Sequence, residues 1–331
     1  MKSDARIFVA GHRGLVGSAI VRRLESGGYT NLILRTRKEL DLLDLAAVRD
    51  FFQREQPEYV FVAAARVGGI SANSTYPAEF IRENTLIAAH LIDEAWRSKS
   101  KRLLYLGSSC IYPRDCPQPI RESSMLTGPL EPTNRAYAVA KIAGVEMCWS
   151  YNRQHGTHFL AAMPTNLYGP GDNYDLQGSH VIPALIRKCH AAKVEGAAEV
   201  VIWGTGSPMR EFLYSEDAAD ALTHLMCLPE ADFVRACGDE EHPPLVNVGS
   251  GIELSIRELA DQVRAAVGFS GKLSFDASKP DGTPRKLLDV SRLAGLGWKA
   301  RTPLAAGLRL AYSDYGLRYG NSGNATGSQR G

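Results

Sequence analysis

The sequence lacks any apolar run of the roughly 18 to 20 residues that a membrane-spanning helix needs. Its first residues, MKSDARIFVAG, contain no basic segment followed by an apolar one, so they do not resemble a secretory signal. Long runs of a single charge are also missing, and 38 basic against 36 acidic residues leave a net charge of only +2. We therefore expect no membrane span, no secretion and no binding to nucleic acid or another polyanion.

Paired cysteine spacings of the kind that hold a metal are absent too. The six cysteines are scattered from Cys110 to Cys237, and a chain of 331 residues needs no disulfides to stabilise its core. We accordingly expect no metal site and a reducing, cytoplasmic location.

The first half of the chain alternates short apolar runs with amphipathic stretches. RIFVAG, NLILRT, YVFVAAA, KRLLYLGSS and HFLAAMPTNLYG are strand-like and apolar throughout, and helical patterns separate them. Continuous apolar strands are typical of a parallel sheet that helices cover on both faces. The pattern predicts an α/β protein with a Rossmann-type, doubly wound parallel sheet over residues 1–164.

Beyond Pro164 the alternation loosens, and Gly/Pro-rich connectors separate shorter strands from helices. We expect residues 165–319 to form mainly a smaller α/β substrate-binding lobe, with some segments returning to the main sheet. The last residues, 320–331, are rich in Gly, Ser and Asn, a composition typical of a disordered tail.

The turn after the first predicted strand contains three glycines, Gly11, Gly14 and Gly17, in GHRGLVG. Glycine permits a tight turn, a close approach to a pyrophosphate and dense packing of helix on strand, while the helix N-terminus offers free N–H groups to phosphates. A glycine-rich turn alone is weak evidence, but its place in the first βαβ unit favours dinucleotide binding.

The second predicted strand, NLILRTRKEL, does not end in the acid that usually holds the ribose 2′-hydroxyl of NAD. Arg35 and Arg37 stand there instead, and Arg13 adds a cation within the glycine loop. Guanidinium groups suit a 2′-phosphate, so the set predicts NADP(H) as the cofactor.

Tyr137 and Lys141 lie four residues apart in RAYAVAKIAG, so both face the same side of a helix, which Pro132–Asn134 should cap. A free phenol has a pKa of about 10, and we expect the adjacent ammonium and the positive ring of the bound cofactor to favour the phenolate. Ser108 closes the strand KRLLYLGSS, where its hydroxyl would hydrogen-bond a substrate carbonyl oxygen.

With these elements in order, the chain resembles the extended short-chain dehydrogenase/reductases that act on nucleotide sugars. The resemblance runs from Arg6 to about Arg309 and is carried by GHRGLVGSAI, RVGGI, GSSCIYP, EPTNRAYAVAKIAG, MPTNLYGP, SHVIPALIRK, WGTGSPMREF and FDASKPDGTPRKLLD. GSSCIYP, SHVIPAL and PMREF are the most restrictive. They are similar to members that epimerise C3 and C5 of a GDP-linked 4-keto-6-deoxy sugar and then reduce its C4 ketone with NADPH.

The resemblance implies that Cys110 and His180 are the acid and base of epimerisation, beside Ser108, Tyr137 and Lys141. A thiol serves as a base where nearby cations lower its pKa, and imidazole titrates near neutrality. Neither the order of the two epimerisations nor which group starts each follows from the sequence.

The same resemblance assigns substrate binding to Lys188, Trp203, Arg210 and Asp281, and it implies a homodimer paired through the two long helices at 78–98 and 135–155. Val67 to Ile70 are expected to form a loop over the site. The residues expected around the cofactor are Gly11, His12, Arg13, Gly14, Leu15, Val16, Gly17, Arg37, Leu42, Leu106, Gly107, Lys141, Pro164, Asn166, Leu167 and His180.

Two other functions fit parts of the pattern. A nucleotide-sugar 4-epimerase or 4,6-dehydratase would keep NAD as a tightly held oxidant, which the missing acid argues against. A non-catalytic dinucleotide-binding sensor or scaffold would need neither Tyr137 nor Lys141, and both are present.

Overall fold

A computed structural model describes residues 1–175, 178–279 and 281–320. Six parallel strands form the main sheet, in the order β2-β1-β3-β4-β5-β9. The chain runs from β1 outward to β2 and then crosses to β3 on the other side of β1, so the order of the strands reverses between β1 and β3. The strands are β1 (Ile7–Ala10), β2 (Leu32–Ile33), β3 (Tyr59–Val62), β4 (Arg102–Leu106), β5 (Phe159–Pro164) and β9 (Leu245–Val248).

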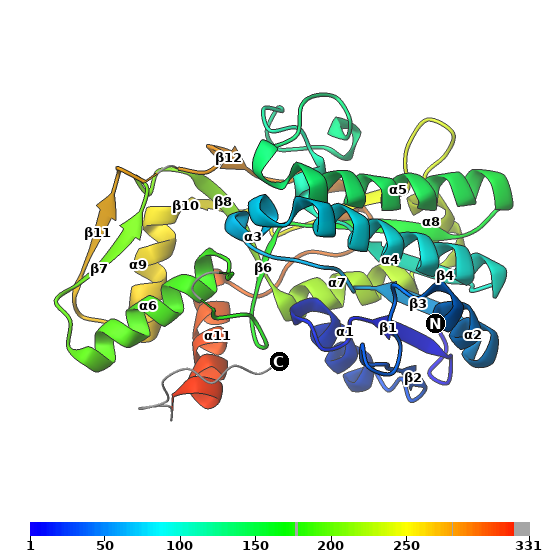
Figure 1. Cartoon of the computed structure of the whole chain (residues 1–331), viewed down its shortest axis with the longest axis horizontal. Helices are drawn as coiled ribbons and strands as arrows, with labels where there is room; N and C mark the ends of the chain where they lie inside the picture. Colours follow the sequence, from blue (N-terminus) through cyan, green and yellow to red (C-terminus); the bar gives the residue numbers. More distant parts are fainter. Residues whose placement is uncertain (176–177, 280, 321–331) are drawn as a thin grey trace.

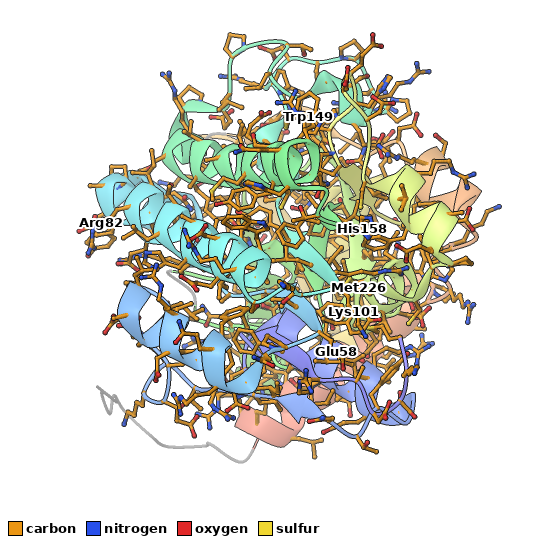
Figure 2. The ribbon with its side chains drawn as sticks, turned by 90° about the vertical axis from the view of Figure 1, so that its right-hand side faces the viewer. Glu58, Arg82, Lys101, Trp149, His158 and Met226 are labelled. Atoms are coloured by element: carbon orange, nitrogen blue, oxygen red, sulfur yellow. The ribbon has the colours of Figure 1, made fainter. Side chains whose placement is uncertain are left out.

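Helices cover both faces of this sheet because its strands are apolar on both sides, as the sequence predicted. In β1, Ile7 and Val9 join one buried cluster while Phe8 and Ala10 join the other. The first face is covered by α1 (Leu15–Ser26), α7 (Ser215–Cys227), α8 (Glu230–Ala236) and α10 (Ser291–Gly295). The second is covered by α2 (Leu45–Glu55), α4 (Pro77–Arg97) and α5 (Arg135–His155); Figure 2 shows α4 and α5 side by side.

A second lobe, on the left of Figure 1, has its own apolar core. It contains the parallel pair β7 and β11 and a small sheet in which β8 pairs with β6, β10 and β12. Its elements are β6 (Asn166–Tyr168), α6 (Val181–Glu195), β7 (Glu199–Trp203), β8 (Met209–Tyr214), β10 (Glu253–Ser255), α9 (Ile256–Val267), β11 (Lys272–Asp276), β12 (Arg285–Lys286) and α11 (Leu304–Tyr319).

The predicted strand HFLAAMPTNLYG is in fact two strands in two sheets. β5 ends at Pro164 beside β9, whereas β6 pairs with β8. Between them the N–H of Thr165 still bonds the carbonyl of Val248. The chain passes from the main sheet to the second lobe here, and it returns at α7, α8, β9 and α10.

Several elements have weak sequence signals and were not predicted. α11 contains Gly307 and Gly316, which lower helix propensity, yet it packs within the second core. The short elements α3 (Ile70–Thr75), η1 (Ser109–Ile111), η2 (Glu122–Ser124) and η3 (Pro132–Asn134) lie in the connections between β3 and α4 and between β4 and α5. The tail predicted to be disordered lies, after Gly320, outside the described residues. Among the residues described, no helix has the length and apolar character to cross a membrane.

Candidate functional site

A cavity of about 880 Å³ opens at the carboxyl ends of the main-sheet strands, at the point between β1 and β3 where the strand order reverses. Open α/β sheets bind ligands at this reversal of strand order. Its walls are the loops that follow β1, β2, β3, β4 and β5, two side chains of α5, and the segment before α6. The cavity therefore lies between the main sheet and the second lobe.

The glycine loop forms one wall and leaves no room for side chains. Gly11 has a φ of 82°, and a Cβ there would lie 2.7 Å from the backbone of Ala64. A Cβ on Gly17 would overlap the carbonyl oxygen of Gly11. Helix α1 begins directly after Gly14, so its free N–H groups face the loop. This arrangement is a phosphate cradle made of main chain.

The three arginines predicted to bind the 2′-phosphate differ in exposure and in their ion pairs. Arg13 and Arg37 are exposed at the cavity wall. Arg35 also lines the cavity, but its guanidinium donates to Glu55 Oε1 at 2.6 Å and lies over the ring of Phe51. The expectation that Arg35 is a free cation is therefore wrong, because an acid 20 residues away neutralises it. Arg13 and Arg37 remain as the candidate phosphate ligands.

All the residues predicted to surround the cofactor line this one cavity. They are Gly11, His12, Arg13, Gly14, Leu15, Val16, Gly17, Arg37, Leu42, Leu106, Gly107, Lys141, Pro164, Asn166, Leu167 and His180. Val67 and Gly68, from the predicted loop over the site, line it as well, while Ile70 begins helix α3.

Ser108, Tyr137 and Lys141 meet at the inner end of the cavity. Ser108 follows β4, and its hydroxyl accepts from the N–H of Cys110 at 3.4 Å while lying close enough to the Tyr137 phenol to lower its pKa. One turn further along α5, Lys141 is 3% exposed and donates from Nζ to the carbonyl of Leu106 at 2.7 Å. The i, i+4 spacing thus brings the phenol and the ammonium to the same wall.

The charge state of Tyr137 differs from the sequence-based expectation. Burial raises the pKa of the phenol above its usual value, the neighbouring Cys110 raises it further, and the Ser108 hydrogen bond opposes the rise only partly. Burial also lowers the pKa of Lys141 to about 8. Desolvation therefore outweighs the Ser108 hydrogen bond, and Tyr137 carries its proton at neutral pH in the cofactor-free chain.

The predicted capping of α5 is also different. Pro132–Asn134 form the 3₁₀ turn η3 before the helix, and the N-cap residue, Asn134, makes no side-chain hydrogen bond to the helix. Its Oδ1 is buried without a partner. The helix begins by continuing from this turn, so its start does not depend on a capping side chain.

Cys110 lies in η1, directly behind Ser108, and is 6% exposed. Burial raises the pKa of its thiol, while Lys286, Ser108 and Lys141 each lower it by a smaller amount. The expectation that cations lower this pKa overall is wrong, because the loss of hydration is larger. The resting side chain is therefore a thiol with a cation beside it.

Lys286 is a cationic neighbour of Cys110 that the sequence reasoning missed. It lies on the short strand β12, opposite Arg210 of β8, and its ammonium acts on Cys110. Burial lowers the pKa of this lysine, and the nearby thiol opposes the change. Lys286 belongs to the string FDASKPDGTPRKLLD, but no spacing rule connects it to a cysteine 176 positions earlier.

His180 reaches the cavity from the second lobe, as the N-cap residue of α6. His180 is an exposed residue, but partial loss of hydration beside the neighbouring atoms lowers the pKa of its imidazole, so the ring is neutral at pH 7 and retains one unprotonated nitrogen. Gly69, at the start of α3, packs against the backbone at 178–179 just before it. The imidazole and the Cys110 thiol thus come from different lobes.

The four residues predicted to bind substrate lie outside this cavity, in two pairs on the second lobe. Lys188 Nζ is 5.7 Å from the ring centre of Trp203, which is 69% exposed. Asp281 attracts the half-buried Arg210 and accepts a hydrogen bond from the N–H of Thr205. Because Thr205 follows Trp203 by two residues, the two pairs are neighbours.

The fold and the site have close counterparts among known proteins. A model of the NAD dependent epimerase/dehydratase family matches residues 7–236. This chain therefore belongs to that family.

Its relatives narrow the comparison. GDP-L-fucose synthase 1 of Arabidopsis thaliana is 56% identical over 312 residues, which cover 94% of this chain and 93% of that protein. GDP-L-fucose synthase of Escherichia coli (strain K12) is 53% identical, over 94% and 96% of the two chains. Among solved structures, MlghC, a GDP-mannoheptose C4 reductase from Campylobacter jejuni with NADP bound, is 38% identical with a TM-score of 0.86, over 95% and 99%. A GDP-L-fucose synthetase from Naegleria fowleri bound to NADP is 26% identical with a TM-score of 0.84, over 97% of each chain.

Proposed function

We propose that this chain converts GDP-4-keto-6-deoxy-D-mannose to GDP-L-fucose. It epimerises C3 and C5 and then reduces the C4 ketone with NADPH. The observation that carries the proposal is that Ser108, Tyr137 and His180 line one cavity, His180 coming from the other lobe. The buried Cys110 thiol does not line the cavity, but it lies behind this wall, close enough to affect the pKa values of Tyr137 and Lys141. The relatives named GDP-L-fucose synthase support the same reaction.

The cavity suits a dinucleotide phosphate. Main chain at Gly11 and Gly17 leaves the space that a pyrophosphate fills, and the N-terminus of α1 faces it. Arg13 and Arg37, together with Lys38, are exposed cations at the cavity wall, and the two guanidinium groups suit a 2′-phosphate. Lys141 would hold the ribose hydroxyls near Tyr137. When bound, NADPH supplies the hydride that reduces C4.

Epimerisation needs a proton taken from one face of the sugar and another returned to the opposite face. The C4 ketone makes the protons at C3 and C5 acidic, because the enolate that forms is stabilised by hydrogen bonds to its oxygen. Ser108 and Tyr137 are placed to donate those bonds. Cys110 and His180 are the two groups that exchange protons with carbon.

The resting protonation states suit this exchange. His180 is neutral and can accept a proton, and the Cys110 thiol can donate one. The Lys286 ammonium favours the thiolate once the proton has left, so the cysteine can also take a proton back. The same pair therefore serves both carbons.

Reduction follows at the same oxygen. The phenol of Tyr137 carries its proton at neutral pH and passes it to the C4 alkoxide. The neighbouring Lys141 ammonium then stabilises the phenolate that remains until solvent reprotonates it. In the second lobe, Arg210 suits the diphosphate and Trp203 is placed to stack on a ring of the GDP.

The test is to mix the purified chain with NADPH and GDP-4-keto-6-deoxy-D-mannose in D₂O. We expect NADPH oxidation and deuterium at C3 and C5 of a GDP-L-fucose product. GDP-mannose, which has no ketone, is the matched control and should give neither. NADPH oxidation without deuterium would instead indicate a plain C4 reductase, the activity for which MlghC is named.

Cys110→Ala separates the two halves of the reaction. This variant should lose deuterium incorporation, since it removes a group that exchanges protons with carbon. Full exchange in Cys110→Ala would remove the cysteine from the mechanism. Copurifying NAD together with no NADPH oxidation by the unaltered chain would favour a 4-epimerase or 4,6-dehydratase, and cofactor binding with no turnover would favour a sensor.

The active form is proposed to be a homodimer located in the cytoplasm. Helices α4 and α5 lie side by side on the surface and expose Ile81 and Val139. Apolar side chains on such a paired face suit burial against the same face of a second copy.

A further inference from the structure

Glu211 is an acid with no exposed surface at all, in strand β8 next to Arg210. Two main-chain N–H groups donate to its carboxylate, and the Ser250 hydroxyl donates a longer bond to Oε1 at 3.5 Å. Oε1 accepts from Gly251 at 2.7 Å, and Oε2 accepts from Leu288 at 3.0 Å. Burying a carboxylate costs free energy of desolvation, so a carboxylate with no exposed surface is expected to have a structural or functional role.

The same residue connects segments of both lobes. Its main-chain oxygen accepts from Thr165 Oγ1 at 3.2 Å and from Asn166 Nδ2 at 2.9 Å, at the junction of β5 and β6. Its carboxylate holds Gly251, in the turn after the main-sheet strand β9, and Leu288, in the segment after β12. Glu211 therefore connects β8 to three other stretches of chain at the lobe boundary.

The surrounding backbone leaves space for this carboxylate. A Cβ on Gly249 would overlap Glu211 Oε1, so only glycine permits the close approach. Burial raises the pKa of Glu211, and its hydrogen bonds with Leu288 and Gly251 oppose the rise. Because each oxygen faces a donor, a protonated acid or an amide would have to give up one of the two bonds.

The strands that Glu211 holds together carry two cations, Arg210 on β8 and Lys286 on β12. Side chains alternate along a strand, so Arg210 points to the opposite face of β8. Lys286 is the register partner of Arg210 on β12, and it precedes Leu288 by two residues. The bond from Leu288 N–H to Glu211 thus fixes the strand that carries Lys286 against the strand that carries Arg210.

We propose that Glu211 is a positioning residue for the GDP-sugar: its buried carboxylate sets the spacing of Arg210 and Lys286. The inference rests on the proposed function, in which Arg210 binds the diphosphate and Lys286 lies beside Cys110. Glu211 touches neither substrate nor cofactor. It acts through the two strands that present the cations.

The first test is Glu211→Gln in the full-length chain, with GDP as the probe in calorimetric titrations. The amide turns a donor toward one N–H, so we expect the Kd for GDP and the KM for the GDP-sugar to rise about tenfold. The Kd for NADPH should stay unchanged, because the bonds to Thr165 and Asn166 in the cofactor cavity come from the main-chain oxygen of residue 211, which glutamine retains.

Asp217→Asn is the matched control for general destabilisation. The Asp217 carboxylate also accepts main-chain bonds from a distant segment, from Arg301 at 3.0 Å and Thr302 at 2.7 Å, but in α7. This variant should lower the melting temperature like Glu211→Gln and leave the Kd for GDP at the unaltered value. An equal loss of GDP affinity in both variants would overturn the positioning role.

A double-mutant cycle completes the test. If Glu211 acts through Arg210, then Arg210→Ala combined with Glu211→Gln should bind GDP no more weakly than Arg210→Ala alone. Additive losses, or unchanged GDP binding by Glu211→Gln, would overturn the inference while turnover by the unaltered chain keeps the proposed function. If the unaltered chain neither binds GDP nor turns over the sugar, the proposed function fails and the inference fails with it.

Discussion

At the scale of single residues, burial decides the chemistry of the site more than charge pairing does. Tyr137, Cys110 and His180 all have pKa values shifted toward their neutral forms, and loss of hydration is the largest cause in each case. Neutral groups hold and exchange protons without requiring charge in an apolar wall. The neighbouring ammonium groups, Lys286 beside Cys110 and Lys141 beside Tyr137, stabilise the anion that forms once the thiol or the phenol has lost its proton.

Tyr137→Phe tests the division of labour at this scale. The variant keeps Cys110, His180 and Ser108 but lacks the proton donor for C4. We expect the rate of NADPH oxidation to fall by at least about a hundredfold, as for loss of a general acid, while deuterium still enters C3 and C5. The measurements are NADPH absorbance and NMR of the sugar. Loss of both signals together would show that Tyr137 is also required for the enolate.

Lys141 makes stability depend on pH. Its pKa is lowered to about 8 in the fold, against 10.5 for an unburied lysine. Between these values the unfolded chain binds more protons than the folded one, so the free energy of unfolding should rise with pH in this window, by up to about 3 kcal/mol. The measurement is denaturant unfolding of the cofactor-free chain from pH 7 to 10.

Lys141→Met provides the comparison, because it removes the titrating group and keeps most of the apolar stem. The difference in stability between the unaltered chain and this variant should change across the window and be flat below pH 7. A difference that is the same at every pH would contradict the lowered pKa.

At the scale of elements, the turn between β1 and α1 depends on backbone contacts that exclude side chains. Gly17→Ala would place a Cβ against the Gly11 carbonyl, so the loop must shift. Overpacking usually costs about 1 to 3 kcal/mol. If the loop must pay this cost to bind NADPH, the Kd for NADPH should rise by about tenfold or more. Fluorescence titration with NADPH measures it.

Gly316→Ala is the control for that change. Gly316 lies in α11, and a Cβ there would meet nothing within 4 Å. This substitution should leave the Kd for NADPH unaltered and raise the melting temperature slightly, because alanine favours a helix more than glycine does. If Gly17→Ala bound NADPH as well as Gly316→Ala does, the loop would not be the phosphate cradle.

At the scale of the whole molecule, the exposed pair α4 and α5 is the surface proposed to form the dimer (Figure 2). Val139 on α5 is 38% exposed. We expect the unaltered chain to sediment as a dimer and Val139→Glu to sediment as a monomer, because two like charges would meet near the two-fold axis. Val234→Glu, which adds a charge to a 43% exposed valine on α8, should stay dimeric. Dimers in both variants would place the interface elsewhere.

The sequence by itself determined the class of fold, the cofactor loop and the reductive pair. The reason is that these signals are local: apolar runs reveal the strands, three glycines mark one turn, and Tyr137 and Lys141 are one helical turn apart. The strings GSSCIYP and SHVIPAL added Cys110 and His180, because a lone cysteine or histidine does not by itself indicate a catalytic role.

Only the tertiary structure decided the pairing and protonation of those groups. Arg35 is neutralised by Glu55, Lys286 approaches Cys110, and Glu211 joins segments of both lobes through partners far apart in sequence. Such contacts follow no periodicity, since they depend on which strands lie side by side. Desolvation likewise depends on how many atoms surround a group, and that is known only once the chain has folded.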